Sequence, residues 1–106
     1  MAKRTIVWTL TASIQRRLIL TYWNKRNKST IYSEKIISFT KARLNIVLNN
    51  PRIGKKTDFP NTCVITLAHF SIFYQYNRKN IIITSFWDNR QDPKKLIILL
   101  KAMEIK

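Results

Sequence analysis

Hydrophobic and polar positions alternate from Thr5 to Leu10 and then recur at helical spacing as far as residue 50. Alternation is typical of a strand, because successive side chains point to opposite faces, so residues 5–10 predict a short first strand. Thr11 can cap a helix from about Ala12 to Lys28. We expect its inner face to hold Leu18 and Tyr22, with Ile14 and Ile19, and its outer face to be basic, with Arg16, Arg17, Lys25, Arg26 and Lys28.

A second helical pattern begins after Ser29, which is a good capping residue. Its apolar positions recur at helical spacing at Tyr32, Ile36, Ile37, Leu44, Val47 and Leu48. The run Asn49-Asn50-Pro51 ends it, since the residue before a proline disfavours helical geometry. We therefore predict two antiparallel helices that pack on each other and on a sheet.

The second half of the chain has the composition of a β-sheet. Residues 52–61 hold the only glycine and one of the three prolines, and another, Pro51, directly precedes them, so they predict a loop. Apolar, β-branched and aromatic runs predict strands over 62–68, 70–76 and 81–87. Asp92-Pro93 then favours a short C-terminal helix. The predicted fold class is α+β, with the helices on one face of a curved antiparallel sheet.

The length limits the number of domains, and the net charge narrows the possible partners. A chain of 106 residues is enough for one domain, so we assign residues 1–106 to a single domain. Twenty Lys and Arg against five Asp and Glu give a net charge of +15. Such a charge attracts nucleic acid, an anionic surface or an acidic protein.

Several functional classes lack support in the composition. One cysteine, Cys63, excludes an internal disulfide and favours a reducing cytoplasm, and no apolar run is long enough for a membrane span or a signal peptide. With one histidine and five carboxylates, the sequence offers no metal cluster, no phosphate-binding glycine loop and no evident nucleophile pair. We expect no metal and no cofactor.

Three segments carry a resemblance to a known family: Asn49-Asn50-Pro51-Arg52-Ile53-Gly54-Lys55, Ile72-Phe73-Tyr74 and Trp87-Asp88-Asn89-Arg90-Gln91-Asp92-Pro93. Together with the order of elements, they resemble the RelE/ParE superfamily of bacterial toxins. The resemblance implies a type II toxin–antitoxin system, in which a cognate antitoxin wraps and inhibits a small basic toxin. It also implies that operator DNA is bound only through the antitoxin complex.

The two branches of that superfamily imply different targets. RelE-like toxins cleave messenger RNA on the ribosome, and ParE-like toxins poison DNA gyrase. A metal-independent nuclease would need cations that stabilise charge on the scissile phosphate, and the candidates are Lys55, Lys56 and Arg90. The alternatives are that the lysines only solvate a loop and that Arg90 forms an ion pair with Asp88 or Asp92.

Departures from the RelE-like pattern favour the ParE-like branch. Ser71 stands where such nucleases commonly carry an arginine, and the C-terminal helix lacks their tyrosine. Tyr74 and Tyr76 are more typical of a core than of a base-stacking surface, and His69 is more typical of a bystander in a turn than of an acid or base. A degenerate toxin that retains only antitoxin or operator-complex binding is the third possibility. The predicted target- or antitoxin-binding residues are Arg16, Arg17, Trp87, Asp88, Arg90, Gln91, Leu96 and Leu100.

Overall fold

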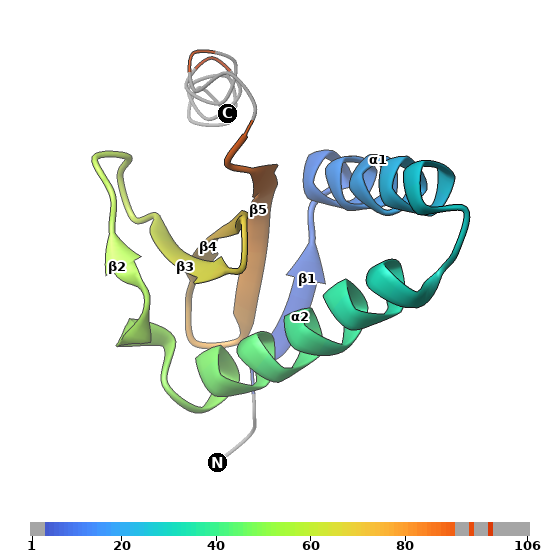
Figure 1. The fold of residues 1–106 in the computed structure, drawn as a ribbon. Coiled ribbons are helices and arrows are strands. Elements are labelled where there is room, and N and C mark those ends of the chain that lie inside the picture. Colours follow the sequence, from blue (N-terminus) through green and yellow to red (C-terminus); the bar gives the residue numbers. More distant parts are fainter. Residues whose placement is uncertain (1–3, 91–93, 95–97, 99–106) are drawn as a thin grey trace.

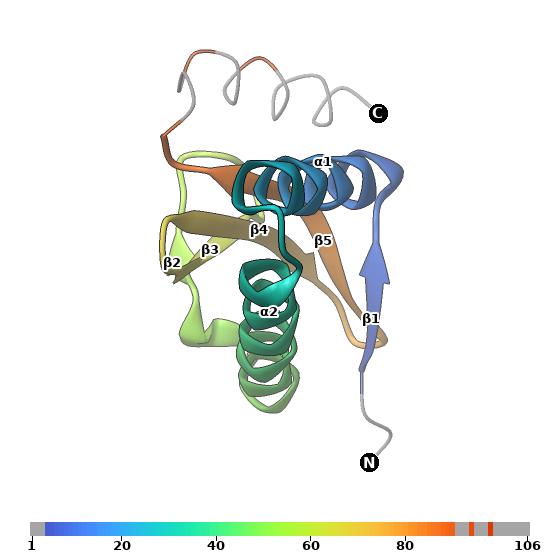
Figure 2. The same ribbon diagram turned by 45° about the vertical axis from the view of Figure 1, so that its right-hand side comes forward.

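The computed structural model describes residues 4–90 together with Lys94 and Ile98, and its fold is α+β as predicted (Figure 1). Two helices precede most of the sheet, and both lie on the same side of it (Figure 2). The elements in chain order are β1 (Thr5–Trp8), α1 (Leu10–Asn27), α2 (Ile31–Asn49), the short 3₁₀ helix η1 (Pro51–Ile53), β2 (Lys55–Lys56), β3 (Cys63–Leu67), β4 (Phe70–Tyr76) and β5 (Asn80–Asp88). Lys94 and Ile98 are helical, and the rest of the predicted C-terminal helix lies outside the described residues.

The five strands form one sheet in the order β1-β5-β4-β3-β2. Hairpin connections make β3, β4 and β5 antiparallel, as predicted. The prediction of a wholly antiparallel sheet is wrong at its first strand, because β1 pairs parallel to β5, with Trp8 opposite Ile83. The helical hairpin carries the chain away from β1 before the sheet continues, and a long crossover of this kind permits parallel pairing.

The segment between α2 and β3, which was predicted to be a loop, contains a short helix and a short strand. Pro51–Ile53 form a 3₁₀ turn, and Lys55 and Lys56 form a two-residue edge strand that pairs with Val64 and Cys63 of β3. The two lysines therefore lie on a strand and not in a loop. Charged residues on an edge strand discourage pairing with other chains.

Helix α1 differs from the prediction in its start and in its inner face. Thr9, and not Thr11, is the cap: its hydroxyl accepts a hydrogen bond from the Ala12 N–H and donates one to the Ile83 carbonyl. Ala12 and Ile19 are the buried residues of α1, and Leu18 and Tyr22 are 62% and 53% exposed. The prediction for the inner face is therefore confirmed for Ile19 and wrong for Leu18, Tyr22 and Ile14.

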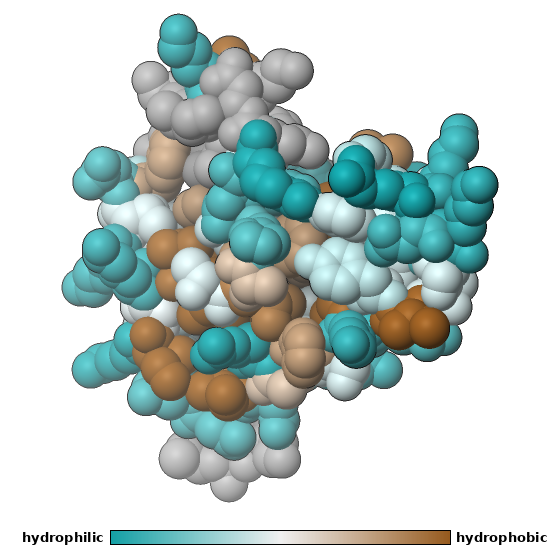
Figure 3. Space-filling view, in the orientation of Figure 1, coloured by the Kyte–Doolittle hydropathy of each residue, from teal (hydrophilic) through white to brown (hydrophobic). Residues whose placement is uncertain are grey.

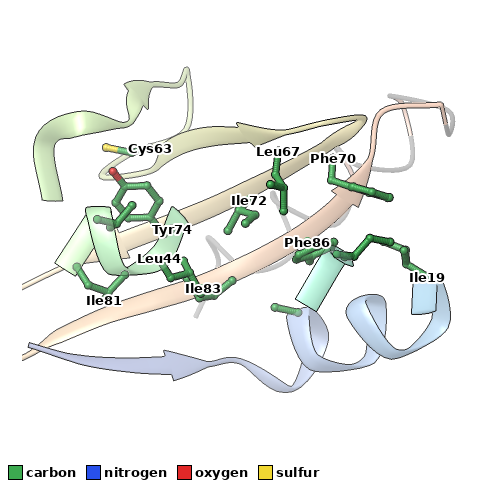
Figure 4. Packing of buried hydrophobic residues seen from close by; sticks show 13 residues of the cluster. Ile19, Leu44, Cys63, Leu67, Phe70, Ile72, Tyr74, Ile81, Ile83 and Phe86 are labelled. Carbon is green, nitrogen blue, oxygen red and sulfur yellow. The ribbon is translucent and has the colours of Figure 1, made fainter. Parts of the chain in front are cut away.

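The main core lies between the helices and the sheet (Figure 4). Helix α2 contributes Ile36, Leu44 and Val47 at the predicted spacing, and the Ser29 hydroxyl accepts a hydrogen bond from the Ile31 N–H at its start. The sheet contributes alternate positions of β3 and β4, and Ile81, Ile83 and Phe86 of β5. The residues of the main core are Ala12, Ile19, Ile36, Leu44, Val47, Cys63, Leu67, Phe70, Ile72, Tyr74, Ile81, Ile83 and Phe86.

One corner of this core, which we call the Tyr74 corner, joins the end of α2 to β4. The hydroxyl of the fully buried Tyr74 donates to the Pro51 carbonyl at 2.7 Å and accepts from the Gly54 N–H at 2.9 Å. A Cβ atom at Gly54 would lie 2.8 Å from the Tyr74 ring carbon Cε1, closer than real contacts allow. The only glycine of the chain is thus required by the close approach of the Tyr74 ring.

Among the described residues, none of the helices is both long enough and apolar enough to cross a bilayer.

Candidate functional site

A groove with a volume of about 520 Å³ lies between α1 and the end of β5. Ligand-binding pockets commonly have volumes of roughly 300–1,000 Å³, so the groove has the size of a binding site. Its described lining residues are Gln15, Leu18, Ile19, Tyr22 and Trp23 from α1, and Phe86, Trp87, Asp88 and Arg90 from β5 and the turn after it. Both elements are needed to form it, because one wall comes from each.

The groove exists because β1 is shorter than β5. Pairing between the two strands ends at Trp8 and Ile83, but β5 continues to Asp88, where it is paired with β4. Beyond Ile83, α1 takes the place of a neighbouring strand. The Gln15 Oε1 atom accepts hydrogen bonds from the Phe86 N–H at 2.9 Å and from the Ser85 hydroxyl at 3.0 Å.

Arg90 lies at the rim of the groove and is held by two neighbours. Its guanidinium makes a bidentate ion pair with Asp88, with Nε–Oδ1 and Nη2–Oδ2 distances of 3.0 and 2.8 Å. Its Cζ atom lies 4.5 Å from the centre of the Trp23 ring, which is the geometry of a cation–π contact. The Arg90 side chain is nevertheless 46% exposed, so it presents part of its charge to solvent.

The ion pair shifts the pKa values of Asp88 and Arg90 so that the charged form of each residue is favoured. Burial opposes ionisation of Asp88, but hydrogen bonds from the Arg90 side chain and backbone N–H outweigh it and lower the pKa of the carboxyl. The same hydrogen bond raises the pKa of Arg90. The ion pair with Asp88 is the alternative that the sequence left open for Arg90, and the structure forms it.

Among the residues that the structure describes, two buried polar atoms of the residues lining the groove have no hydrogen-bond partner. Gln15 Nε2 and Trp23 Nε1 are buried N–H donors without a hydrogen bond, although the other polar atom of the Gln15 amide is fully used. Buried donors without a partner are rare in folded proteins and costly. Both residues line the same groove, but the two donor atoms themselves are buried beneath its surface.

The fold does not bring the three candidate catalytic cations together. Lys55 lies on the edge strand β2, which is separated from β5 by β3 and β4. At about 4.8 Å per strand, that is roughly 14 Å across the sheet. Arg90 also lies beyond the end of β5, and the register places Lys55 level with Ser85 in the middle of that strand.

The position of the missing hairpin arginine is also uncharged. Ser71 is buried, and its hydroxyl donates to the Asn89 side chain at 2.8 Å. Its partners across the strands are Thr66 and Trp87, neither of which is a cation. Tyr74 belongs to the core, as the sequence indicated. Tyr76 is 37% exposed and lies against Arg4, so it is not part of that core.

The predicted target- or antitoxin-binding residues fall into three groups. Asp88, Arg90 and Trp87 line the groove, although Trp87 is buried and packs with Phe73 on the other side of the sheet. Arg16 and Arg17 lie on α1 outside the groove lining; Arg16 stacks on Trp8 at 4.6 Å, and Arg17 is exposed. Figure 3 shows hydrophilic side chains gathered over α1. Gln91, Leu96 and Leu100 lie outside the described residues.

Sequence reasoning missed Gln15 and Trp23, the two residues with unpaired donors. A signal for them existed, because Ala12, Gln15, Ile19 and Trp23 recur three or four residues apart and therefore share one face of a helix. That face is the one turned to the sheet. A polar glutamine on it was the sign of a hydrogen bond to the strand edge.

Within the residues that the structure describes, no group of histidine, cysteine and acidic side chains could hold a metal ion. The groove offers apolar walls and one partly exposed guanidinium. Such a set binds an apolar surface that carries a carboxylate.

Comparison with known proteins gives a likeness of fold. No protein-family model matches the chain, and no curated protein matches it by sequence. Among solved structures, it is similar to a chain of the chromosomal ParDE TA system from P. aeruginosa, with a TM-score of 0.66 and 17% sequence identity. The match covers 79% of this chain and 94% of that chain. The fold expected from the RelE/ParE resemblance is thereby confirmed.

Proposed function

We propose that this protein is the toxin of a type II toxin–antitoxin system, held inactive by an acidic cognate antitoxin. The observation that carries the proposal is the fold shared with a chain of a ParDE system over most of both chains. A likeness of fold alone is compatible with many functions. The charge and the groove supply the independent support.

The charge supports an acidic partner because it is not neutralised within the molecule. The chain carries a net charge of +15, and within residues 4–90 one ion pair forms, between Arg90 and Asp88. Unpaired surface cations raise the rate of encounter with an acidic protein. In this proposal, operator DNA is bound only through the antitoxin complex.

We further propose that the toxin acts by binding DNA gyrase, as ParE-like toxins do, and not by cleaving messenger RNA. The separation of Lys55 and Lys56 from Arg90 supports this choice, as does the uncharged surrounding of Ser71. Stabilising a pentacovalent phosphate needs donors about 3 Å from one position, and these cations do not share one. The partial exposure of Arg90 suits a contact with a partner's carboxylate or phosphate.

Induced expression in a bacterial host tests the proposal. We expect growth to stop, with DNA damage and loss of gyrase supercoiling activity preceding any loss of protein synthesis. The double variant Lys55→Ala/Lys56→Ala should inhibit growth as strongly as the parent chain. Co-expression of the small acidic protein encoded beside the gene should restore growth.

Other outcomes identify the alternatives. Early arrest of translation with cleaved messenger RNA, abolished by the double lysine variant, would indicate a RelE-like endoribonuclease. A protein that leaves growth unchanged yet binds the adjacent acidic protein would be a degenerate toxin. Absence of both growth inhibition and binding would contradict the toxin assignment.

A further inference from the structure

The guanidinium of Arg90 lies where three segments of the chain meet. Asp88, at the end of β5, accepts hydrogen bonds from its Nε and Nη2 atoms at 3.0 and 2.8 Å. Trp23, in α1, lies against it, with 4.5 Å between the Arg90 Cζ atom and the centre of the Trp23 ring. Tyr32, in α2, meets the Trp23 ring edge-on, with 4.9 Å between the ring centres. The position of Arg90 therefore depends on both helices as well as on β5.

The ion pair alone is a weak restraint on the Arg90 side chain. The side chain is 46% exposed, so water competes with Asp88 for its N–H groups. A flat guanidinium also stacks well on an indole ring, and this contact uses its face and not its N–H groups. The ion pair and the stacking contact therefore add to each other. Within residues 4–90, Arg90 is the only cation that has both.

Trp23 is a firm support because its own ring is fixed. The ring packs against the main core. The rings of Tyr22 and Tyr32 meet it at interplanar angles of 88° and 73°, with centres 5.2 and 4.9 Å away. Edge-to-face contacts of this kind are the favoured geometry for aromatic pairs. A change in the packing of the helical hairpin would thus be transmitted to Arg90 through Trp23.

The two contacts leave one end of the Arg90 guanidinium free. A guanidinium has five N–H groups, and Asp88 occupies the one on Nε and one of those on Nη2. Among the described residues, the groups on Nη1 and the second group on Nη2 have no partner. One N–H from each of these two nitrogen atoms points outward in parallel. Such a pair can bind two oxygen atoms of a carboxylate or of a phosphate.

We propose that Trp23 is a positioning residue, whose ring, together with Asp88, holds Arg90 so that the free end of the guanidinium faces a carboxylate or phosphate of the target. This inference rests on the proposed function, for which it explains how Arg90 is presented. In this account, Trp23 acts through Arg90 and does not contact the target. Prior orientation raises affinity, because the side chain is already ordered before the target binds.

The first measurement is spectroscopic and uses the full chain without a target. In two-dimensional NMR spectra, protons that lie over an indole ring are shifted upfield. We expect the side-chain signals of Arg90 to lie upfield of those of the exposed Arg17, and Arg90→Ala identifies them by their loss. Trp23→Leu should abolish the upfield shift, whereas Trp23→Phe, which keeps an aromatic face, should retain part of it.

Trp8→Leu is the matched control for the spectra. The Arg16 guanidinium stacks on Trp8 at 4.6 Å, which is nearly the distance between Arg90 and Trp23. The control should therefore change the signals of Arg16 and leave those of Arg90 in place. Thermal unfolding of every variant gives the folded fraction, so that only folded protein is compared.

The second measurement is the affinity of the folded variants for purified DNA gyrase. Trp23→Leu should weaken binding roughly 2- to 30-fold, which is the range expected from the strength of a cation–π contact, and Trp23→Phe should restore much of the loss. In a chain that already carries Arg90→Ala, Trp23→Leu should have no further effect, because Trp23 acts through Arg90. Gyrase is presented with and without DNA: an effect of Arg90 without DNA indicates a carboxylate of the enzyme, and an effect only with DNA indicates a phosphate.

Several results would overturn the inference. Arg90 signals of the parent chain that lie with those of Arg17 would show that the guanidinium does not stay on the ring. Signals that Trp23→Leu leaves unchanged would exclude the ring as the support. Equal weakening by Trp23→Leu with and without Arg90→Ala would mean that Trp23 contacts the target itself. A parent chain that does not bind gyrase contradicts the proposed function instead, and the spectra still decide whether Trp23 positions Arg90.

Discussion

The Tyr74 corner and the groove beside Trp23 differ in whether the polar atom of a buried aromatic side chain has hydrogen-bond partners. The Tyr74 hydroxyl has a donor and an acceptor, both from the backbone around η1, and the space at Gly54 is filled by its ring. Among the described residues, the buried Trp23 Nε1 atom has no hydrogen-bond partner, and Trp23 lines the open groove. A region whose polar groups are all paired stabilises the fold, whereas a buried donor without a partner costs stability.

Titration behaviour shows the same contrast. Burial raises the pKa of Tyr74 to about 12, although the hydrogen bond from Gly54 opposes the shift. The neutral hydroxyl is therefore the form that the folded corner accommodates. At the groove, the exposed Arg90 side chain lowers the pKa of Asp88, so the charged form is favoured there.

The largest expected effect tests whether the end of β5, which forms one wall of the groove, is as firmly packed as the Tyr74 corner. Trp87 is 6% exposed and packs with Phe73, so Trp87→Ala should destabilise the fold by about 3–5 kcal/mol. Urea unfolding followed by circular dichroism measures it. Phe39→Ala, at a position that is 54% exposed, should change stability by no more than about 0.5 kcal/mol. If the Trp87 variant unfolds at the same urea concentration as the parent chain, packing of Trp87 does not stabilise the end of β5.

The second-largest expected effect tests the packing of the Tyr74 corner itself. Gly54→Ala puts a methyl group where the Tyr74 ring lies, and overpacking of this kind costs about 1–3 kcal/mol. Ile53→Ala, one residue away and 52% exposed, is the control. Both are compared by thermal unfolding. Equal stability of the two variants would mean that the corner can expand, and the contrast with the groove would then be weaker.

Arg90 separates stability from function at the rim of the groove. Because the side chain is 46% exposed, its ion pair with Asp88 stabilises the fold by at most about 1 kcal/mol. Arg90→Ala should abolish growth inhibition and remain folded, and Arg90→Lys should restore it poorly, since an ammonium cannot replace a bidentate guanidinium. Lys41→Ala, which changes an exposed cation of α2 outside the groove, is the control.

Growth inhibition and melting temperature are measured on the same Arg90 variants. A loss of toxicity that only follows a loss of folded protein would assign Arg90 to the support of Asp88. A folded Arg90→Ala protein that still stops growth would remove this residue from the mechanism.

The smallest effect is a dependence of stability on pH. The pKa of Asp88 is lower in the folded state than in the unfolded chain, so its stabilisation is complete above the unfolded value of 3.8 and is lost as the pH falls through the folded value. Arg90→Ala should reduce this acid-dependent loss, by a fraction of about 1 kcal/mol. Urea unfolding at a series of pH values between roughly 2 and 6 measures it. Parallel curves for the parent and the variant would contradict the effect of Arg90.

Strands β3, β4 and β5 were predictable from sequence because an apolar, β-branched run indicates a buried strand without knowledge of the rest of the fold. The predicted strands over 62–68, 70–76 and 81–87 agree with β3, β4 and β5 within one residue at each end. The parallel pairing of β1 was not predictable in this way, because its partner lies in the last quarter of the described chain. Pairing at that distance depends on the tertiary fold and not on local pattern.

The inner face of α1 was mispredicted for a related reason. The helix carries two rows at helical spacing, one of Leu10, Ile14, Leu18 and Tyr22 and one of Ala12, Gln15, Ile19 and Trp23. The first row is the more apolar, so hydrophobicity alone assigns it to the core. The structure buries the second, because the free edge of β5 needs the hydrogen-bond acceptor of Gln15. The candidate groove was therefore beyond a prediction from α1 alone, although Trp87, Asp88 and Arg90 were identified from the end of β5.

The distance along the chain between the two walls of the groove has a consequence for synthesis. The wall from α1 is complete at residue 27, whereas β5 is made only between residues 80 and 88. A ribosome that has made the first half of the protein has thus made one wall without the other, and β1 has no partner until β5 emerges. An inhibitor that recognises both walls can therefore bind the chain only after β5 has been made. The amount of inhibitor that is needed follows the number of chains that have passed residue 88, and not the number whose synthesis has begun.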